Sequence, residues 1–454
     1  MKKFICYVLS LLIFLSACVM SDTVYAAESS DISSLLPAPP EIVAEAGVVM
    51  ELSTGTVLYN KNMHNKMYPA SITKIMTTLL TLENCKLDDM ITFSHYDVYS
   101  LVYGDAHIGM RENEQLSVYD CLRGVMLASA NECANAAGEH VAMQTDAYKN
   151  KIADLDAQGK DYDASITALD VFADMMNDRA KKAGALNTHF TNPSGLFNEN
   201  HYTTCYDMAR ITRAAASNQD FLDIESKTIY TIPPTNLVAE PRTIGNRHKM
   251  LYENNKNYYE GILGGKTGYV DQSGNTLVTF AKRNGITLIS VVMKSNSANV
   301  YNDTRLLLDY GFSNCQSVNL ASTDTTYNLE NSLYSLNADD NLILPASISF
   351  ADVKSSVEPS VTSPEIHYTY NGVELGNTRL STNPDIFCSF KLGPDAIKHL
   401  KHKSKENTSV LTVIIKVIII TAIIIIITLA VFFIVRYRLN SKRRRNRKKR
   451  KRNH

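Results

Sequence analysis

The sequence predicts an α/β domain, then a small all-β domain and one C-terminal membrane-spanning helix. Strand-like runs and helical periodicities are mixed up to about residue 312, which is typical of an α/β domain. Beyond Cys315 the chain has short alternating runs without a helical period, which indicate strands. Residues 417–435 carry no charge and are dominated by isoleucine, as in a membrane span.

Composition and charge limit the class of protein. The chain has 454 residues, of which 45% are hydrophobic and 20% are charged, so it can fold into two or three globular domains. From Arg436 to His454 there are 12 Lys and Arg and no Asp or Glu, which leaves 34 basic and 46 acidic residues elsewhere. The body of the chain is therefore acidic, and we expect no nucleic-acid partner.

The N-terminus resembles a secretory signal. Lys2 and Lys3 precede an apolar run from Phe4 to Ala17, and the small residues of Val24-Tyr25-Ala26 suit cleavage after Ala26. Residues 1–26 are thus the expected signal peptide. A second interpretation stays open, because Leu15-Ser16-Ala17-Cys18 resembles the lipidation site of bacterial lipoproteins.

The C-terminal part of the sequence predicts a membrane anchor. The 19 residues of 417–435 nearly span a hydrocarbon core of about 30 Å at about 1.5 Å per residue. The basic residues 436–454 then form a cytoplasmic tail by the positive-inside rule, and residues 396–416 form a juxtamembrane linker. We expect a single-pass protein of the cell membrane whose folded part is extracellular.

The first half of the α/β domain, predicted to span residues 41–312, follows a Ser- and Pro-rich linker at 27–40. Gly47–Leu52 and Thr56–Asn60 read as a hairpin, and a helical pattern starts at Ser71. A second helix is expected over Leu116–Leu127, capped by Ser117 and Asp120. It breaks at residues 128–131 and is followed by another helix to about Met143.

The second half contains a polar stretch, a helix and a strand pair. Residues 145–170 look like an insertion, after which Val171–Lys182 is amphipathic. Thr276–Phe280 and Ile286–Met293 are strands joined by the hairpin signal Asn284-Gly285, and Val300–Tyr310 is a helix. The all-β domain is predicted to occupy residues 313–395.

Six cysteines remain once the signal is removed. Their spacings are irregular and include no Cys-x-x-Cys, so we expect neither a zinc site nor a disulfide framework. Most should be small buried hydrophobic residues. These cysteines are Cys85, Cys121, Cys133, Cys205, Cys315 and Cys388.

One Ser-x-x-Lys, Ser71 to Lys74, lies at the start of a predicted helix. Residues three apart share a helix face, so the Lys74 amine can lie beside the Ser71 hydroxyl and act as its base. By itself the pattern fits a helix cap and a solvated lysine equally well, since about one or two matches arise by chance in such a chain.

Two further short motifs occur in order along the chain. Ser129-Ala130-Asn131 lies at the predicted helix break, where a turn can direct both polar side chains to one site. The pattern also occurs at 273–275 and 297–299, so alone it says little. Lys266-Thr267-Gly268 occurs once, just before the strand pair, and could present a cation and a hydroxyl to a substrate carboxylate.

Together the three motifs resemble the signature of penicillin-binding proteins and serine β-lactamases. Their flanks look like those of the D-alanyl-D-alanine carboxypeptidases, the low-molecular-mass penicillin-binding proteins of peptidase family S11. The resemblance covers about residues 40–312, and the β segment is similar to that family's C-terminal domain. It implies an antiparallel sheet flanked by helices, with a helical subdomain. The matching segments are Tyr68-Pro-Ala-Ser-Ile-Thr-Lys74, Met126-Leu-Ala-Ser-Ala-Asn131, Asn192-Pro-Ser-Gly-Leu196, His201-Tyr-Thr-Thr-Cys-Tyr-Asp207 and Gly265-Lys-Thr-Gly-Tyr269.

The resemblance implies roles for individual side chains. Ser71 would attack the penultimate D-Ala carbonyl of a peptidoglycan stem peptide, Lys74 would accept its proton, and Ser129 would pass a proton to the leaving D-Ala. The expected substrate-binding residues are Asn131 for the peptide backbone, Lys266 and Thr267 for the terminal carboxylate, Gly268 for close approach, and Tyr269, whose N–H joins that of Ser71 in the oxyanion hole. No cofactor or metal is implied, and β-lactams are the expected inhibitors.

The sequence departs from the family's pattern at some positions, and it leaves other functions open. His248 stands where relatives commonly have Asn, His107 and His201 are expected to be structural or surface groups, and the Glu motif of class A β-lactamases is not evident. Transpeptidation of the same acyl-enzyme cannot be separated from hydrolysis by the motifs. A penicillin receptor without turnover would need a cytoplasmic signalling domain, and a silent wall-binding protein would not need the complete triple motif.

Overall fold

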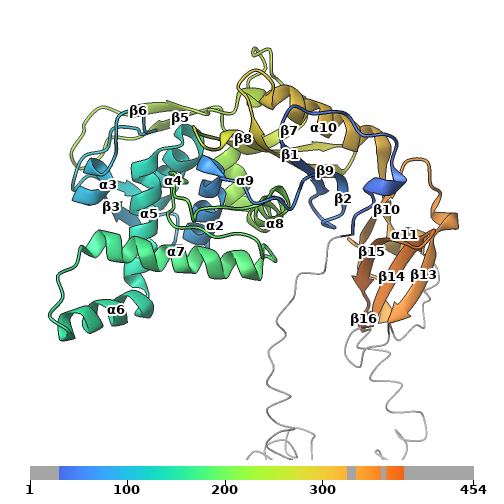
Figure 1. Ribbon diagram of the computed structural model, residues 1–454, viewed down its shortest axis with the longest axis horizontal. Coiled ribbons are helices and arrows are strands. Elements are labelled where there is room, and N and C mark those ends of the chain that lie inside the picture. Colours follow the sequence, from blue (N-terminus) through green and yellow to red (C-terminus); the bar gives the residue numbers. More distant parts are fainter. Residues whose placement is uncertain (1–29, 325–333, 359–363, 383–454) are drawn as a thin grey trace, which may run out of the picture. The chain divides into compact units, whose positions relative to one another are not determined.

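The computed structural model describes residues 30–324, 334–358 and 364–382 (Figure 1). The predicted signal peptide, the predicted span at 417–435 and the basic tail lie outside these ranges. No helix within the described ranges combines the length and the apolar character that a membrane crossing needs.

The α/β part is built on a five-stranded antiparallel sheet. Its strand order is β2-β1-β9-β8-β7, so strands from the two ends of the domain lie side by side. Both predicted hairpins are confirmed, and Asn284 and Gly285 have the positive φ values of 49° and 80° that a tight hairpin turn requires. The strands are β1 (Ala46–Glu51), β2 (Val57–Lys61), β7 (Ile262–Val270), β8 (Gly274–Arg283) and β9 (Ile286–Ser295).

Both faces of this sheet are covered by helices. Helix α10 (Val300–Asn314) packs on β8 and β9, and α8 (Cys205–Ala216) packs on β9 and β1. Side chains of one strand alternate between the two faces, so Val278 and Phe280 join one buried cluster while Leu277 and Ala281 join the other. The predicted layered α/β arrangement is confirmed.

A helical subdomain packs around α2. Two boundaries differ from the prediction: the helix expected from Leu116 starts at Val118, because Gln115–Ser117 pairs with Met90–Thr92 as a strand, and α7 starts well before Val171. The helices of this part are α2 (Lys74–Asn84), α3 (His95–Tyr99), α4 (Val118–Arg123), α5 (Asn131–Gln144), α6 (Asp146–Ala157), α7 (Ala164–Lys182) and α9 (Gln219–Ser226).

Short elements connect these layers. Part of the predicted linker is packed, since Ile32 is buried and its N–H donates to the carbonyl of Val57 at 3.0 Å. The short elements are η1 (Ser33–Leu35), η2 (Ala70–Thr73), β3 (Met90–Thr92), β4 (Gln115–Ser117), η3 (Gly124–Ala128), β5 (Ile229–Ile232), β6 (Arg242–Gly245) and η4 (Lys249–Leu251).

The described residues after Asn314 are mainly β structure, as predicted. The hairpin around Asn371-Gly372 joins two strands of a three-stranded sheet, and both turn residues have positive φ. The elements are β10 (Cys315–Asn319), α11 (Leu320–Thr323), β11 (Tyr334–Ser335), β12 (Asn341–Pro345), η5 (Phe350–Asp352), β13 (Lys354–Glu358), β14 (Glu365–Tyr370), β15 (Val373–Arg379) and β16 (Ser381–Thr382).

The described cysteines are all free thiols, and most of them are buried, as expected. Cys121, Cys133, Cys205 and Cys315 are buried, whereas Cys85 is only half-buried. Cys388 lies outside the described residues.

Candidate active site

Ser71 and Lys74 meet at the start of α2. Ala70 has a φ of 52°, and the short 3-10 turn Ala70–Thr73 then carries the chain into the helix. As the three-residue spacing predicts, the two side chains share a face, and Lys74 Nζ lies 3.1 Å from Ser71 Oγ.

The Lys74 amine is arranged to accept a proton. Its side chain is fully buried, and Nζ donates to Asn131 Oδ1 at 2.7 Å and to the carbonyl of Ser194 at 2.6 Å. Burial lowers its pKa well below the usual range, and the nearby Lys266 cation lowers it further. In its neutral form the amine has two N–H bonds, which these two acceptors can take, and one lone pair that is then available to accept the Ser71 proton.

The Ser-x-Asn motif lies at the predicted break between two helices. A π-helical turn, Gly124–Ala128, ends at Ser129, whose φ of 64° is left-handed. Asn131 then begins α5, and its N–H donates to the carbonyl of Ala106 at 2.7 Å. This reversal directs the Ser129 and Asn131 side chains to the same cavity.

Lys266 and Thr267 lie on β7, the edge strand next to the cavity. Lys266 is buried, and its Nζ donates to Ser129 Oγ at 2.9 Å, which links the second and third motifs. Burial lowers the pKa of Lys266 to about 7; the Glu225 carboxylate opposes this shift and Arg247 adds to it. At neutral pH the Lys266 side chain is therefore near the midpoint of its titration, and the Ser129 hydroxyl is its neighbour.

Gly268 and Tyr269 continue β7 past the nucleophile. A Cβ on Gly268 would lie 2.3 Å from Thr276 Oγ1 and 2.9 Å from the backbone nitrogen of Ser71, so only glycine fits. Thr276 Oγ1 also donates to the carbonyl of Pro69 at 2.8 Å, which ties the nucleophile turn to the sheet. The strand that holds Tyr269 therefore passes directly beside the Ser71 amide.

The motifs surround one cavity of about 590 Å³. Beside the expected residues, a loop at 103–106, Arg247 and Tyr301 line it. The expected residues in its lining are Ser71, Ser129, Asn131, Thr267, Gly268 and Tyr269; Lys74 and Lys266 are buried behind them.

A family comparison agrees with this geometry. The sequence profile of Peptidase_S11, described as D-alanyl-D-alanine carboxypeptidase, matches residues 34–154 and 166–297, which is more than half of the chain. The chain belongs to this family. The unmatched residues 155–165 lie within the polar stretch that reads as an insertion.

Individual peptidase S11 relatives match the same part of the chain. D-alanyl-D-alanine carboxypeptidase DacF of Bacillus subtilis is 30% identical over 280 residues, 60% of this chain and 62% of that protein. DacC of Escherichia coli is 28% identical over 299 residues, 63% of this chain and 66% of that protein. The chain thus aligns with slightly less than two thirds of the length of these two relatives.

Solved structures share the fold. The Streptomyces K15 DD-transpeptidase has a TM-score of 0.53 and 27% identity, with 61% of this chain and 100% of that chain covered. Penicillin-binding protein 6B of Escherichia coli has a TM-score of 0.58, 23% identity and coverage of 78% and 100%.

Three contributors to this S11 site had no role assigned from the sequence. The Ser194 carbonyl holds the Lys74 amine, and Gly195, with φ of 82°, passes so close to Ala70 that a Cβ would lie 2.0 Å from its carbonyl oxygen. Their motif, Asn192-Pro-Ser-Gly-Leu196, was a possible signal. Glu225 is fully buried and accepts from the Gly265 N–H at 2.8 Å, and burial raises its pKa to about 8. As one acidic residue near a helix end, it carries no sequence signal.

The histidines are mostly structural, as expected. The Thr191 N–H donates to Nδ1 of buried His201, so Nε2 carries the hydrogen and donates to Thr73 Oγ1 at 2.9 Å. His248 is also buried and lies 2.8 Å from Thr279 Oγ1 through Nε2. It is absent from the cavity lining, whereas His107 is exposed.

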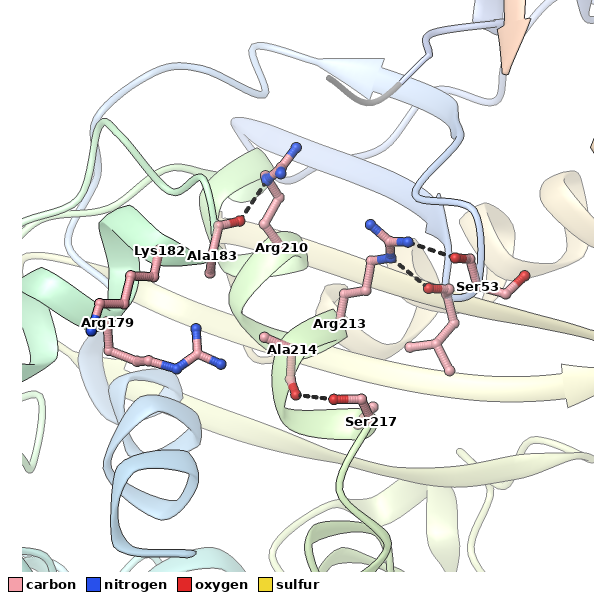
Figure 2. Close-up of a pocket in the computed structure, with 10 residues that line it drawn as sticks. Ser53, Arg179, Lys182, Ala183, Arg210, Arg213, Ala214 and Ser217 are labelled. Carbon is pink, nitrogen blue, oxygen red and sulfur yellow. Dashed lines mark hydrogen bonds between the residues drawn. The ribbon is translucent and has the colours of Figure 1, made fainter. Parts of the chain in front are cut away.

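A second cavity, of about 420 Å³, lacks comparable chemistry (Figure 2). Two of its arginines hold the backbone: Arg213 Nε donates to the carbonyl of Leu52 at 2.7 Å, and Arg210 Nε donates to the carbonyl of Ala183 at 2.8 Å. The Ser217 hydroxyl donates to the carbonyl of Ala214 and has no adjacent base in the lining.

Proposed function

We propose that the protein is a serine-type D-alanyl-D-alanine carboxypeptidase that removes the terminal D-Ala from peptidoglycan stem pentapeptides and binds penicillin. The observation that carries this is the buried Lys74 amine, whose Nζ lies 3.1 Å from Ser71 Oγ, while Lys266 Nζ lies 2.9 Å from Ser129 Oγ in the same site. Family membership and the names of the relatives support the substrate class.

Acylation starts with Ser71. Its Oγ attacks the penultimate D-Ala carbonyl while Lys74 Nζ takes the hydroxyl proton, and the C–N bond to the terminal D-Ala then breaks. Ser129 Oγ, in contact with Lys266 Nζ, passes a proton to the leaving amine. General base catalysis typically contributes a factor of about 10²–10⁴.

Recognition uses β7 and α5. Lys266, when protonated, and Thr267 bind the terminal carboxylate, and charge-assisted contacts of this kind are stronger than neutral hydrogen bonds. Asn131 holds the peptide backbone. The N–H groups of Ser71 and Tyr269 stabilise the oxyanion, and the loss of one such donor typically costs about 10²–10³ in turnover.

Two candidate reactions differ only in the group that attacks the acyl-enzyme. Water activated by Lys74 gives carboxypeptidase action, whereas an amine nucleophile gives transpeptidation. The second candidate is favoured by one observation: the chain covers all of the Streptomyces K15 protein, which is named a DD-transpeptidase. Measuring both products with and without an added amino-acid acceptor distinguishes them.

The location of the enzyme is also a proposal. Residues 1–26 would direct export, residues 417–435 would anchor the chain in the cell membrane, and the catalytic part would face the cell wall. A chain ending near Ser409 should be released and remain active. If it stayed on the membrane, lipidation at Cys18 would become the leading anchor.

The decisive experiment counts free D-Ala per enzyme molecule. The purified full chain, mixed with a D-Ala-D-Ala peptide, should release D-Ala over many turnovers, and Ser71→Ala should release none and carry no penicilloyl adduct by intact mass. A burst that stops at one equivalent would indicate a receptor, and labelling of the Ser71→Ala chain would remove Ser71 as nucleophile.

A further inference from the structure

Three metal-ligating side chains converge outside the catalytic cavity. Cys85 ends α2, Asp89 lies in the following turn, and His140 lies on α5, more than 50 residues later. One sulfur, oxygen or nitrogen atom from each lies within 4.8 Å of the others. The cysteine spacing predicts no zinc site, but the fold brings a histidine and a carboxylate to a thiol.

The group also has unmet bonding capacity. His140 Nε2 is shielded from solvent and has no hydrogen-bond partner in the described structure. Asp89 Oδ2 accepts from the Lys86 N–H at 2.8 Å, and the Asp89 N–H donates back to the Lys86 carbonyl at 3.2 Å. This small ring fixes the carboxylate and leaves its other oxygen for a ligand.

Zn²⁺ binds a neutral imidazole and a thiolate, so its binding must release the Cys85 proton. Burial lowers the pKa of His140, which favours the neutral imidazole that a metal binds. Burial and Asp89 raise the pKa of Cys85 to about 11, while a hydrogen bond from Gln144 opposes that rise. A bound cation would displace the thiol proton to solvent and would be neutralised by the thiolate and the carboxylate.

We propose that Cys85, Asp89 and His140 bind one Zn²⁺, with water as the fourth ligand. A thiolate, an imidazole and a carboxylate form a ligand set that suits zinc, whereas Mg²⁺ and Ca²⁺ prefer oxygen alone. Ligand atoms in a zinc tetrahedron are about 3.3–3.8 Å apart at the usual bond lengths. The ligand atoms therefore need to approach one another by at most about 1.5 Å.

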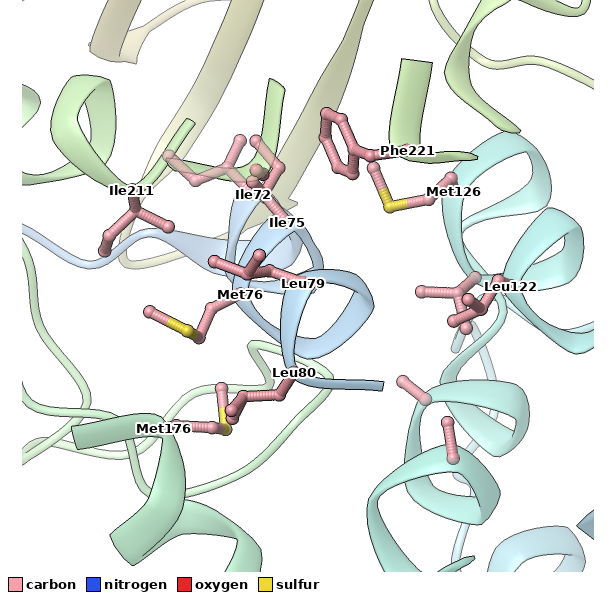
Figure 3. Close-up of a cluster of buried hydrophobic side chains, with 14 of the residues drawn as sticks. Ile72, Ile75, Met76, Leu79, Leu80, Leu122, Met126, Met176, Ile211 and Phe221 are labelled. Atoms are coloured by element: carbon pink, nitrogen blue, oxygen red, sulfur yellow. The ribbon is translucent and has the colours of Figure 1, made fainter. Parts of the chain in front are cut away.

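The position of the site suggests its effect. Helix α2 is the centre of an apolar cluster in which Ile75, Met76 and Leu79 are packed between neighbouring helices (Figure 3). At their N-terminal ends, α2 and α5 present Lys74 and Asn131, joined at 2.7 Å. Zinc would join the same two helices at the other end of α2, so it should raise the melting temperature of the domain.

The first test uses the full chain, purified without a histidine tag and stripped of metal. With buffered Zn²⁺ it should retain one zinc per chain, and Co²⁺ should give a thiolate-to-metal charge-transfer band. Cys85→Ser, Asp89→Asn and His140→Gln should each weaken binding at least about tenfold, because even the loss of a residue that only supports a metal ligand typically costs about 10- to 100-fold in affinity. The matched controls, Cys315→Ala and His95→Gln, should bind like the parent.

A second measurement needs no variant. Cys85 is the one described cysteine that is not fully buried, so alkylation followed by peptide mapping should modify it in the stripped chain, and zinc should protect it. The proposal is overturned if the parent chain binds less than about a tenth of an equivalent, if Cys85→Ser binds as well as the parent, or if zinc leaves alkylation of Cys85 unchanged.

Discussion

Replacing Gly268 by alanine tests whether β7 positions the nucleophile. Real Cβ atoms essentially never approach a heavy atom closer than 3.0 Å, yet this one would lie 2.9 Å from the Ser71 nitrogen and 2.3 Å from Thr276 Oγ1. Thr276 cannot turn away without losing its hydrogen bond to the Pro69 carbonyl. Ordinary contact begins near 3.4 Å, so β7 and the Ser71 backbone must separate by about half an ångström to restore it.

That movement has a calculable consequence. A misplacement of about 1 Å at a reacting centre can cost about 10²-fold in rate, so we expect acylation by a fluorescent penicillin to slow by about 10- to 100-fold. Overpacking should cost about 1–3 kcal/mol of stability. Gly311→Ala is the control, because its Cβ would meet Leu288 at 2.6 Å, away from Ser71. Acylation of Gly268→Ala within threefold of the parent would refute the reasoning.

Three further outcomes are expected. Lys74→Met keeps the side chain's length but has no basic amine, so acylation measured by stopped flow should fall by about 10²–10⁴-fold without loss of the folded state; a smaller loss would move the base elsewhere. Lys266 binds a carboxylate only when protonated and has a pKa of about 7, so substrate affinity should fall as pH rises through about 7. A plot of KM against pH measures this fall in affinity; a KM that does not rise across pH 7 would contradict the assignment of the carboxylate contact to Lys266. Leu79→Ala, at a side chain 1% exposed, should cost about 2–5 kcal/mol in chemical denaturation, whereas Leu186→Ala, at 72% exposed, should change stability by less than about 0.5 kcal/mol.

Local signals in the sequence determined much of the fold. The hairpin at Asn284-Gly285 follows from two residues that tolerate positive φ, and the α2 pattern follows from apolar side chains at helical spacing. Boundaries failed where long-range pairing intervened. The helical pattern was expected to begin at Leu116. Instead, residues 115–117 pair with Met90–Thr92 as a strand, and the helix begins at Val118.

In the active site, too, local spacing determined some contacts and long-range packing determined others. The three-residue spacing of Ser71 and Lys74 fixes their contact, because both lie on one turn of one helix. The contact between Lys266 and Ser129 joins residues 137 positions apart and depends on how an edge strand meets a left-handed turn.

Only the tertiary structure revealed the neighbours that set the chemistry. Glu225 has no motif, yet it lies close enough to Lys266 to influence the pKa of that amine, and the Ser194 carbonyl accepts a hydrogen bond from the Lys74 amine. The Cys85, Asp89 and His140 group is likewise invisible as a pattern, since its members are 4 and 51 residues apart along the chain. The sequence determined which chemical groups are present and their local spacing, whereas packing decided which of them are desolvated together, and desolvation shifts a pKa or leaves a ligand atom without a partner.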